Sequence, residues 1–80
     1  MMKYSEFYEL FKEEIEIEQD LEMNLETELS SLDKWDSMGL LVAITFIDEN
    51  FQKKILLEDF KDVETIKDIV SLIGVDNFSE

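Results

Sequence analysis

The stretch 36–39 holds the residue best suited to chemistry in this chain, a serine between an aspartate and an apolar segment. Asp36 and Ser37 precede residues 40–51, whose composition is that of a strongly apolar helix. The side chain of either residue can accept a hydrogen bond from an unpaired amide of a first helical turn. Ser37 therefore has two interpretations, a helix cap and a hydroxyl exposed for covalent modification.

The residue types elsewhere in the chain exclude most catalytic chemistry. The 80 residues include no cysteine and no histidine, which excludes disulfides, thiolate metal sites and the commonest general base. The neighbour of Ser37 is Asp36, and a carboxylate is a weak base for removing a serine proton. We therefore expect no catalytic residue and no metal site, and a reaction at Ser37 would need a separate enzyme.

The charge of the chain limits its partners. Twenty-one acidic residues against seven basic ones give a net charge of -14, so nucleic acids and anionic membranes should repel the protein. The longest apolar run, residues 40–44, is too short to span a bilayer, and no early segment has the pattern of a secretory signal. We expect a cytoplasmic monomer with basic protein partners, no nucleic-acid binding and no membrane insertion.

Helical periodicity accounts for most of the chain, which contains no proline and only two glycines. In residues 4–16 the apolar side chains recur at helical spacing and predict a buried face made of Tyr4, Phe7, Phe11 and Ile15. Lys12 and its acidic neighbours are predicted to face solvent. The expected elements are a first helix at 4–16, a loop at 17–36, a second helix at 37–51, a short third helix at 56–61, a fourth helix at 65–73 and a frayed tail at 75–80.

The segment between the first two helices allows two interpretations. Its leucines are spaced at four, four and three residues, which would suit another helix: Leu21, Leu25, Leu29 and Leu32. Asparagine, threonine, serine and aspartate residues between them compete for local backbone hydrogen bonds. We therefore predict a long loop with one helical turn, held on the core by its leucines.

Apolar stripes and caps define the remaining helices. The second helix has one stripe predicted to be core, made of Leu41, Ile44, Ile47 and Phe51. A second apolar set lies partly off this stripe and needs a neighbour or a partner to cover it, namely Leu40, Val42 and Phe46. A short cluster is expected to pack on the bundle through Ile55, Leu56, Leu57 and Phe60. Thr65 with Asp68 predicts a capping box, and Gly74 suits a left-handed helix end.

The order and spacing of these elements resemble the acyl carrier protein family across essentially the whole chain. The resemblance rests on Asp36-Ser37-Met38 at the start of the second helix, on the apolar stripe that follows and on the helix capped by Thr65. It implies an all-α fold, a single domain over residues 1–80 that forms a four-helix bundle. The bundle has a long loop between helices 1 and 2 and a short third helix.

Membership of that family would imply a carrier rather than an enzyme. The resemblance implies that Ser37 carries 4′-phosphopantetheine from coenzyme A, with Asp36, Met38 and Gly39 beside it, and that the thiol of the arm holds an acyl or aminoacyl thioester. The implied partners are a phosphopantetheinyl transferase, an acyl- or aminoacyl-loading ligase, and acyltransferase or synthase enzymes. Because the protein itself has no thiol, the arm would supply the only one.

The second helix also departs from the family. Carriers usually present several carboxylates along it, whereas here only Asp48 and Glu49 keep that character and the middle is Val42, Thr45 and Phe46. These five residues are the predicted partner surface, and they favour a specialised rather than a housekeeping carrier. An acyl pocket, if formed, would be lined by Leu41, Ile44, Ile47 and Ile66, although a close-packed core is the ordinary alternative.

Two other classes of function fit parts of the sequence. A small acidic interaction or adaptor protein would explain the charge and would leave Ser37 as a helix cap only. A calcium-binding module is suggested by the carboxylate density, but no segment has the alternating ligands and central glycine of an EF-hand loop.

Overall fold

The computed structural model describes residues 1–33 and 35–79, and over these residues the chain is mostly helical. The elements are β1 (Met2–Lys3), α1 (Tyr4–Glu14), α2 (Ser37–Phe51), α3 (Ile66–Ile73) and β2 (Phe78–Ser79), with 3₁₀ turns at Leu29–Ser31, Leu57–Phe60 and Val75–Asn77. The predicted helical class is therefore confirmed, although some elements differ from the prediction. The segment expected as a third helix is a single 3₁₀ turn, and the chain ends form a short parallel strand pair.

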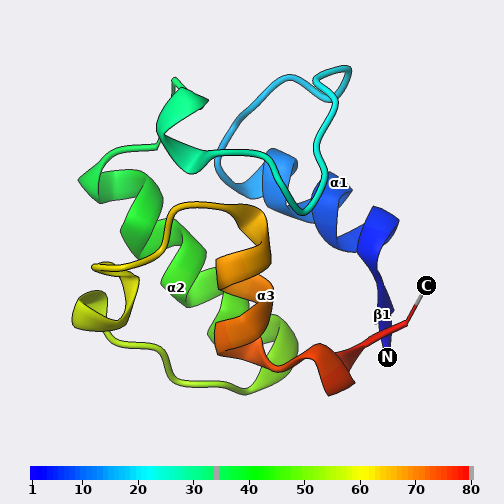
Figure 1. Ribbon diagram of the computed structural model, residues 1–80, viewed down its shortest axis with the longest axis vertical. Helices are drawn as coiled ribbons and strands as arrows, with labels where there is room; N and C mark the ends of the chain where they lie inside the picture. The colour runs from blue at the N-terminus through cyan, green and yellow to red at the C-terminus, as the bar shows by residue number, and fades with distance from the viewer. Residues whose placement is uncertain (34, 80) are drawn as a thin grey trace.

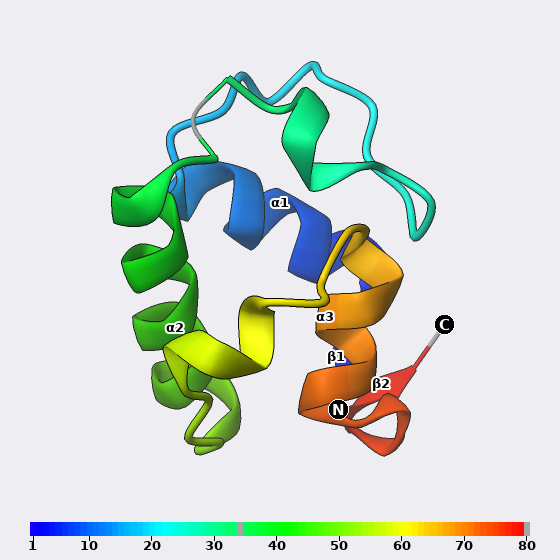
Figure 2. The same ribbon diagram turned by 60° about the vertical axis from the view of Figure 1, so that its left-hand side comes forward.

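Aromatic side chains from α1 fill the centre of the core. Phe7 and Phe11 are completely buried, and their ring centroids lie 5.8 and 6.2 Å from that of Phe46 in α2. In Figure 2 the helices α2 and α3 lie on opposite sides of the fold, with α1 crossing near one end. Phe60 of the second 3₁₀ turn is also buried, which brings that turn between α2 and α3 (Figure 2).

The segment after α1 is a loop with one 3₁₀ turn, as predicted, and it covers the α1 end of the molecule (Figure 1). Leu29 and Leu32 are buried and hold the loop on the core, whereas Leu21 remains exposed. The loop is also bonded to the start of α3. The amide of Leu29 donates to the carbonyl of Glu64 at 2.9 Å, and the amides of Ile66 and Lys67 donate back to the loop at 3.1 and 2.9 Å.

The C-terminus of α1 explains where this loop begins. The helix ends at Glu14, two residues before the predicted end, because Glu16 adopts the left-handed conformation with φ of 61°. The amides of Glu16 and Ile17 then donate to the carbonyls of Glu13 and Lys12 at 3.2 and 2.8 Å. This pairing of the last carbonyls is a Schellman ending, with a glutamate at the position where glycine is usual.

Lys12 is buried, so its predicted position on the solvent side is wrong. Its ammonium group donates hydrogen bonds to the backbone carbonyls of Gln19 and Leu21, both at 2.8 Å. The long aliphatic stem of lysine can lie along the core while its charge reaches the loop carbonyls. Lys12 therefore fastens the first part of the loop to α1.

The prediction of a frayed tail is also wrong. Phe78 is 6% exposed, and its ring stacks on that of Tyr4 with 5.0 Å between centroids and 2° between the ring planes. The same segment forms β2, in which Phe78 pairs with Met2 of β1 in parallel register. Burial of an aromatic ring outweighs the tendency of a chain end to fray, and it brings the two ends together (Figure 1).

The cap of α3 confirms the predicted pairing of Thr65 with Asp68. The carboxylate of Asp68 accepts hydrogen bonds from the backbone amides of Glu64 and Thr65 at 2.9 and 3.1 Å. At the other end Gly74 has a backbone φ of 109°, and residues with a Cβ atom rarely adopt this value. Both ends of α3 are therefore set by residues recognisable in the sequence.

The hydrogen bonds from the backbone of Glu64 and Thr65 hold the pKa of Asp68 below its ordinary value. Because the folded state favours the charged form, the stabilisation by this cap is present above the unfolded pKa and is lost as pH falls through the lowered pKa. We expect Asp68→Asn to lower Tm at neutral pH and the Tm difference from wild type to disappear in acid. Thermal unfolding followed by circular dichroism between neutral pH and strong acid measures this.

A matched variant separates the cap from the effect of net charge. Asp62→Asn removes the same charge from an exposed position, and we expect it to leave Tm unchanged or to raise it, because the chain is strongly acidic. Equal behaviour of the two variants at neutral pH would contradict the role given to Asp68.

Candidate functional site

Ser37 is the first residue of α2, and its side chain is exposed. The cap of this helix is Asp36, whose Oδ1 accepts a hydrogen bond from the amide of Gly39 at 2.9 Å. The first hydrogen bond of the helix joins the amide of Leu40 to the carbonyl of Asp36 at 2.9 Å. Of the two residues that could cap this helix, Asp36 does so, and the Ser37 hydroxyl remains at the surface.

The surroundings of Ser37 combine an open side with a packed side. Met38 is 67% exposed beside it, whereas Gly39 is buried in the same turn. The amides of Ser37 and Met38 precede the first amide that bonds within the helix, so they lie at the positive end of the helix dipole. This end of α2 can therefore accommodate an anionic group on the serine oxygen without burying it.

Trp35 supports this helix start from the side of the loop. Its ring is half-buried, with centroids 6.1 Å from those of Phe11 in α1 and Phe60 in the second 3₁₀ turn. The Trp35 ring therefore packs against α1 and the second 3₁₀ turn while part of it remains exposed. These ring contacts lie directly before Asp36 and join the start of α2 to the core.

The buried face of α2 differs from the predicted stripe. Ala43, Phe46 and Ile47 are buried, whereas Leu41, predicted as core, is 49% exposed. Phe46, predicted as a partner contact, is only 2% exposed and meets the rings of Phe7 and Phe11. Both assignments were wrong because α2 is apolar over two overlapping stripes, and only the aromatic residues of α1 decide which one is buried.

The other predicted partner residues lie at or near the surface. Thr45, Asp48 and Glu49 are exposed, and Val42 is half-buried. The hydroxyl of Thr45 donates to the carbonyl of Leu41 at 3.1 Å, within the same helix. This part of α2 therefore presents a mixed surface of apolar groups and two carboxylates.

The sequence interpretation missed two exposed leucines near this surface. Leu56 and Leu57 are 59% and 56% exposed, although they were predicted to pack on the bundle. Ile55, which precedes the turn, and Phe60, its last residue, are buried instead. The available signal was the run of three consecutive apolar residues at 55–57, which leads into a single turn, because a short segment of this kind cannot direct all three side chains inward.

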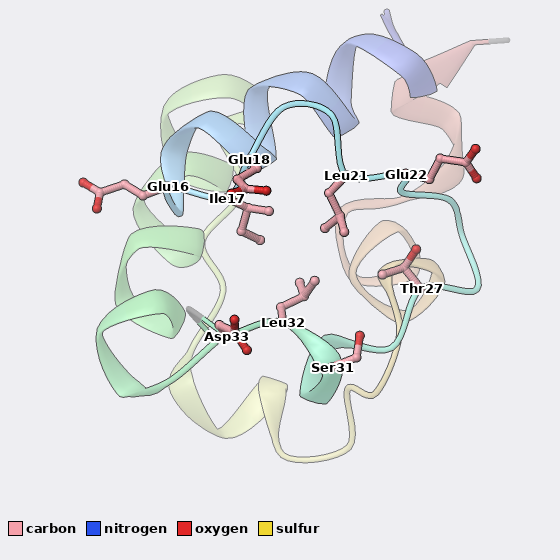
Figure 3. Close-up of a pocket in the computed structure, with 9 residues that line it drawn as sticks. All are labelled: Glu16, Ile17, Glu18, Leu21, Glu22, Thr27, Ser31, Leu32 and Asp33. Atoms are coloured by element: carbon pink, nitrogen blue, oxygen red, sulfur yellow. The ribbon is translucent and has the colours of Figure 1, made fainter.

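The residues proposed to line an acyl pocket do not enclose one. Ile47 and Ile66 are completely buried in the core, Ile44 is half-buried and Leu41 is on the surface. A cavity of about 360 Å³ lies instead beside the loop, lined by residues of the two segments 16–22 and 27–33 (Figure 3). Ile47 and Ile66 are therefore members of the buried core rather than of this cavity.

Comparisons with known proteins give no further guide to the site. No family model matches the sequence, and neither the curated proteins nor the solved structures contain a match. Among residues 1–33 and 35–79 no group of three or more carboxylates is arranged to hold a metal ion. None of the helices in the same residues is long and apolar enough to cross a lipid bilayer.

Proposed function

We propose that this chain is a carrier protein of the acyl carrier type, with 4′-phosphopantetheine attached to Ser37. The observation that supports this most directly is the division of roles at the start of α2. Asp36 provides the cap through its bond to the Gly39 amide, so the exposed Ser37 hydroxyl is not needed for the helix. An exposed hydroxyl at a capped helix start is accessible to an external transferase.

Attachment of the arm follows a phosphoryl transfer from coenzyme A. A bond forms between Oγ of Ser37 and the phosphorus that bears the pantetheine arm. The bond from that phosphorus to adenosine 3′,5′-bisphosphate breaks. The serine proton goes to a base of the transferase, because the carrier has no histidine and the Asp36 carboxylate is bonded to the helix. The helix dipole of α2 partly offsets the added phosphate charge.

The apolar surface beside Ser37 supports recognition of partner enzymes. Met38 and Leu41 are exposed on α2, and Asp48 and Glu49 add carboxylates farther along the helix. Basic enzymes with an apolar contact surface would complement this combination, and a loading ligase or an acyltransferase is the expected class. The limited charge in the middle of α2 favours a specialised carrier in the cytoplasm that acts as a monomer.

The proposal also includes the correspondence between these elements and the four helices of acyl carriers. The 3₁₀ turn Leu57–Phe60 corresponds to the short third helix of acyl carriers, and α3 corresponds to their closing fourth helix. In this correspondence the loop with its Leu29–Ser31 turn joins the first two helices. The carrier contributes delivery of a tethered thioester at high effective concentration and contains no catalytic group.

Incubation with coenzyme A, Mg²⁺ and a broad-specificity phosphopantetheinyl transferase tests this proposal. Intact mass spectrometry is expected to show one arm on the wild-type chain and none on Ser37→Ala. The Ser37→Ala chain should keep the Tm of the wild type within experimental error, because the side chain is exposed and does not cap α2.

Ser71→Ala is the matched control, because Ser71 is also exposed on a helix. We expect it to be loaded like the wild type. A wild-type chain that stays unmodified would instead favour an acidic interaction protein, and loading of Ser37→Ala would place the arm on another residue.

A further inference from the structure

The cavity beside the loop does not have Ser37, the proposed attachment site, among its lining residues, and it has a distinct chemical character. It has a volume of about 360 Å³ and is formed by two segments, residues 16–22 after α1 and residues 27–33 around the first 3₁₀ turn. The two segments run on opposite sides of the opening in Figure 3. Its size is within the range of small-molecule sites in proteins.

The interior of the cavity is apolar. Leu21 and Leu32 point toward each other across the opening, with Ile17 beside them (Figure 3). Leu32 is buried, whereas the side chain of Leu21 is 39% exposed although its backbone carbonyl accepts a hydrogen bond from Lys12. An apolar group placed between the two leucines would remove this exposed surface from water, which is favourable.

The rim of the cavity is acidic. The carboxylates of Glu16, Glu18, Glu22 and Asp33 belong to its lining residues, and those of Glu16 and Glu22 point outward in Figure 3. No lysine belongs to the described lining residues, and the ammonium of Lys12 is bonded to the carbonyls of Gln19 and Leu21. Four carboxylates among the described lining residues give a field that favours cations over anions.

A hydroxyl group on the same wall can accept a hydrogen bond. Ser31 lines the cavity, and its hydroxyl donates its only hydrogen to the carbonyl of Glu28 at 2.6 Å. The lone pairs of this oxygen are therefore available to an N–H donor, whereas a second acceptor would find no hydrogen there. Ser31 therefore favours a ligand that donates a hydrogen bond, and the rim carboxylates favour a ligand that carries a positive charge. An ammonium group meets both conditions.

We propose that this cavity binds a small organic cation, an ammonium group carried on an apolar body. The apolar body lies between Leu21 and Leu32, and the ammonium lies toward the rim, within reach of Ser31 and the carboxylates. The charge of the rim decides the occupant, because a neutral ligand gains only the apolar contact and an anion is repelled. This binding does not depend on modification of Ser37.

Three probes of similar shape and different charge test the proposal. 2-Phenylethylammonium, 2-phenylethanol and 3-phenylpropionate are titrated at neutral pH into the ¹⁵N-labelled chain, and amide shifts are followed by NMR. We expect saturable shifts in residues 16–33 with the ammonium, binding weaker by about fivefold or more with the alcohol, and no saturable shifts with the carboxylate. Equal binding of ammonium and alcohol, or shifts centred elsewhere, would overturn the proposal.

Two double variants with the same net charge separate the rim from the overall acidity. Glu18→Gln/Asp33→Asn changes the rim, and Glu58→Gln/Asp76→Asn changes exposed positions outside the cavity lining. We expect affinity for 2-phenylethylammonium to fall about tenfold with the first pair and less than about twofold with the second. Equal losses would assign the binding to diffuse charge. The Ser37→Ala chain should bind like the wild type, so the outcome is independent of the carrier proposal.

Discussion

Phe46→Ala is expected to unfold most of the chain at room temperature. The side chain is nearly completely buried and meets Phe7 and Phe11, so its loss removes a large apolar contact and leaves a cavity. Such truncations of phenylalanine cost about 3–5 kcal/mol, and a domain of this size without staples has a total stability of about the same magnitude. Urea unfolding followed by tryptophan fluorescence and circular dichroism measures the change.

Leu41→Ala is the matched variant, because it truncates another large apolar residue of the same helix. Leu41 is half-exposed, so we expect a loss of about 1 kcal/mol or less. The sequence pattern alone predicts the reverse order, with Leu41 in the core and Phe46 on the partner surface. A larger loss for Leu41→Ala than for Phe46→Ala would therefore show that the other stripe of α2 is buried.

Lys12→Met is expected to release the first part of the loop. Methionine can follow the path of the aliphatic stem but cannot donate to the carbonyls of Gln19 and Leu21. Hydrogen bonds from charged donors are worth more than neutral ones, and we expect a loss of about 2 kcal/mol because water can partly replace the ammonium. Hydrogen exchange should become faster within residues 17–23, and urea unfolding gives the loss of stability.

The control for this prediction is Lys61→Met, which removes the same charge from an exposed position. Both variants make the net charge more negative by one, so repulsion changes in the same direction in each. If Lys61→Met lost as much stability as Lys12→Met, the effect would be electrostatic repulsion rather than the two hydrogen bonds.

The sequence alone was sufficient for features that depend on neighbouring residues. The absence of cysteine and histidine restricts the chemistry directly, and the positions of α1, α2 and α3 follow from apolar periods within each segment. The caps at Asp36 and Asp68 and the positive φ at Gly74 were also predictable, because their bonds span three or four residues. The loop at 17–36 with its single turn was predictable because its polar residues compete for the backbone hydrogen bonds of a helix.

Contacts between distant segments decided the rest. The burial of Phe46 rather than Leu41 depends on the rings of α1, and the order of the tail depends on Phe78 meeting Tyr4 across almost the whole chain. Lys12 is buried because loop carbonyls seven and nine residues away accept its hydrogen bonds. A periodic pattern identifies apolar positions but carries no information on which distant side chain will cover each one, so these outcomes required the tertiary structure.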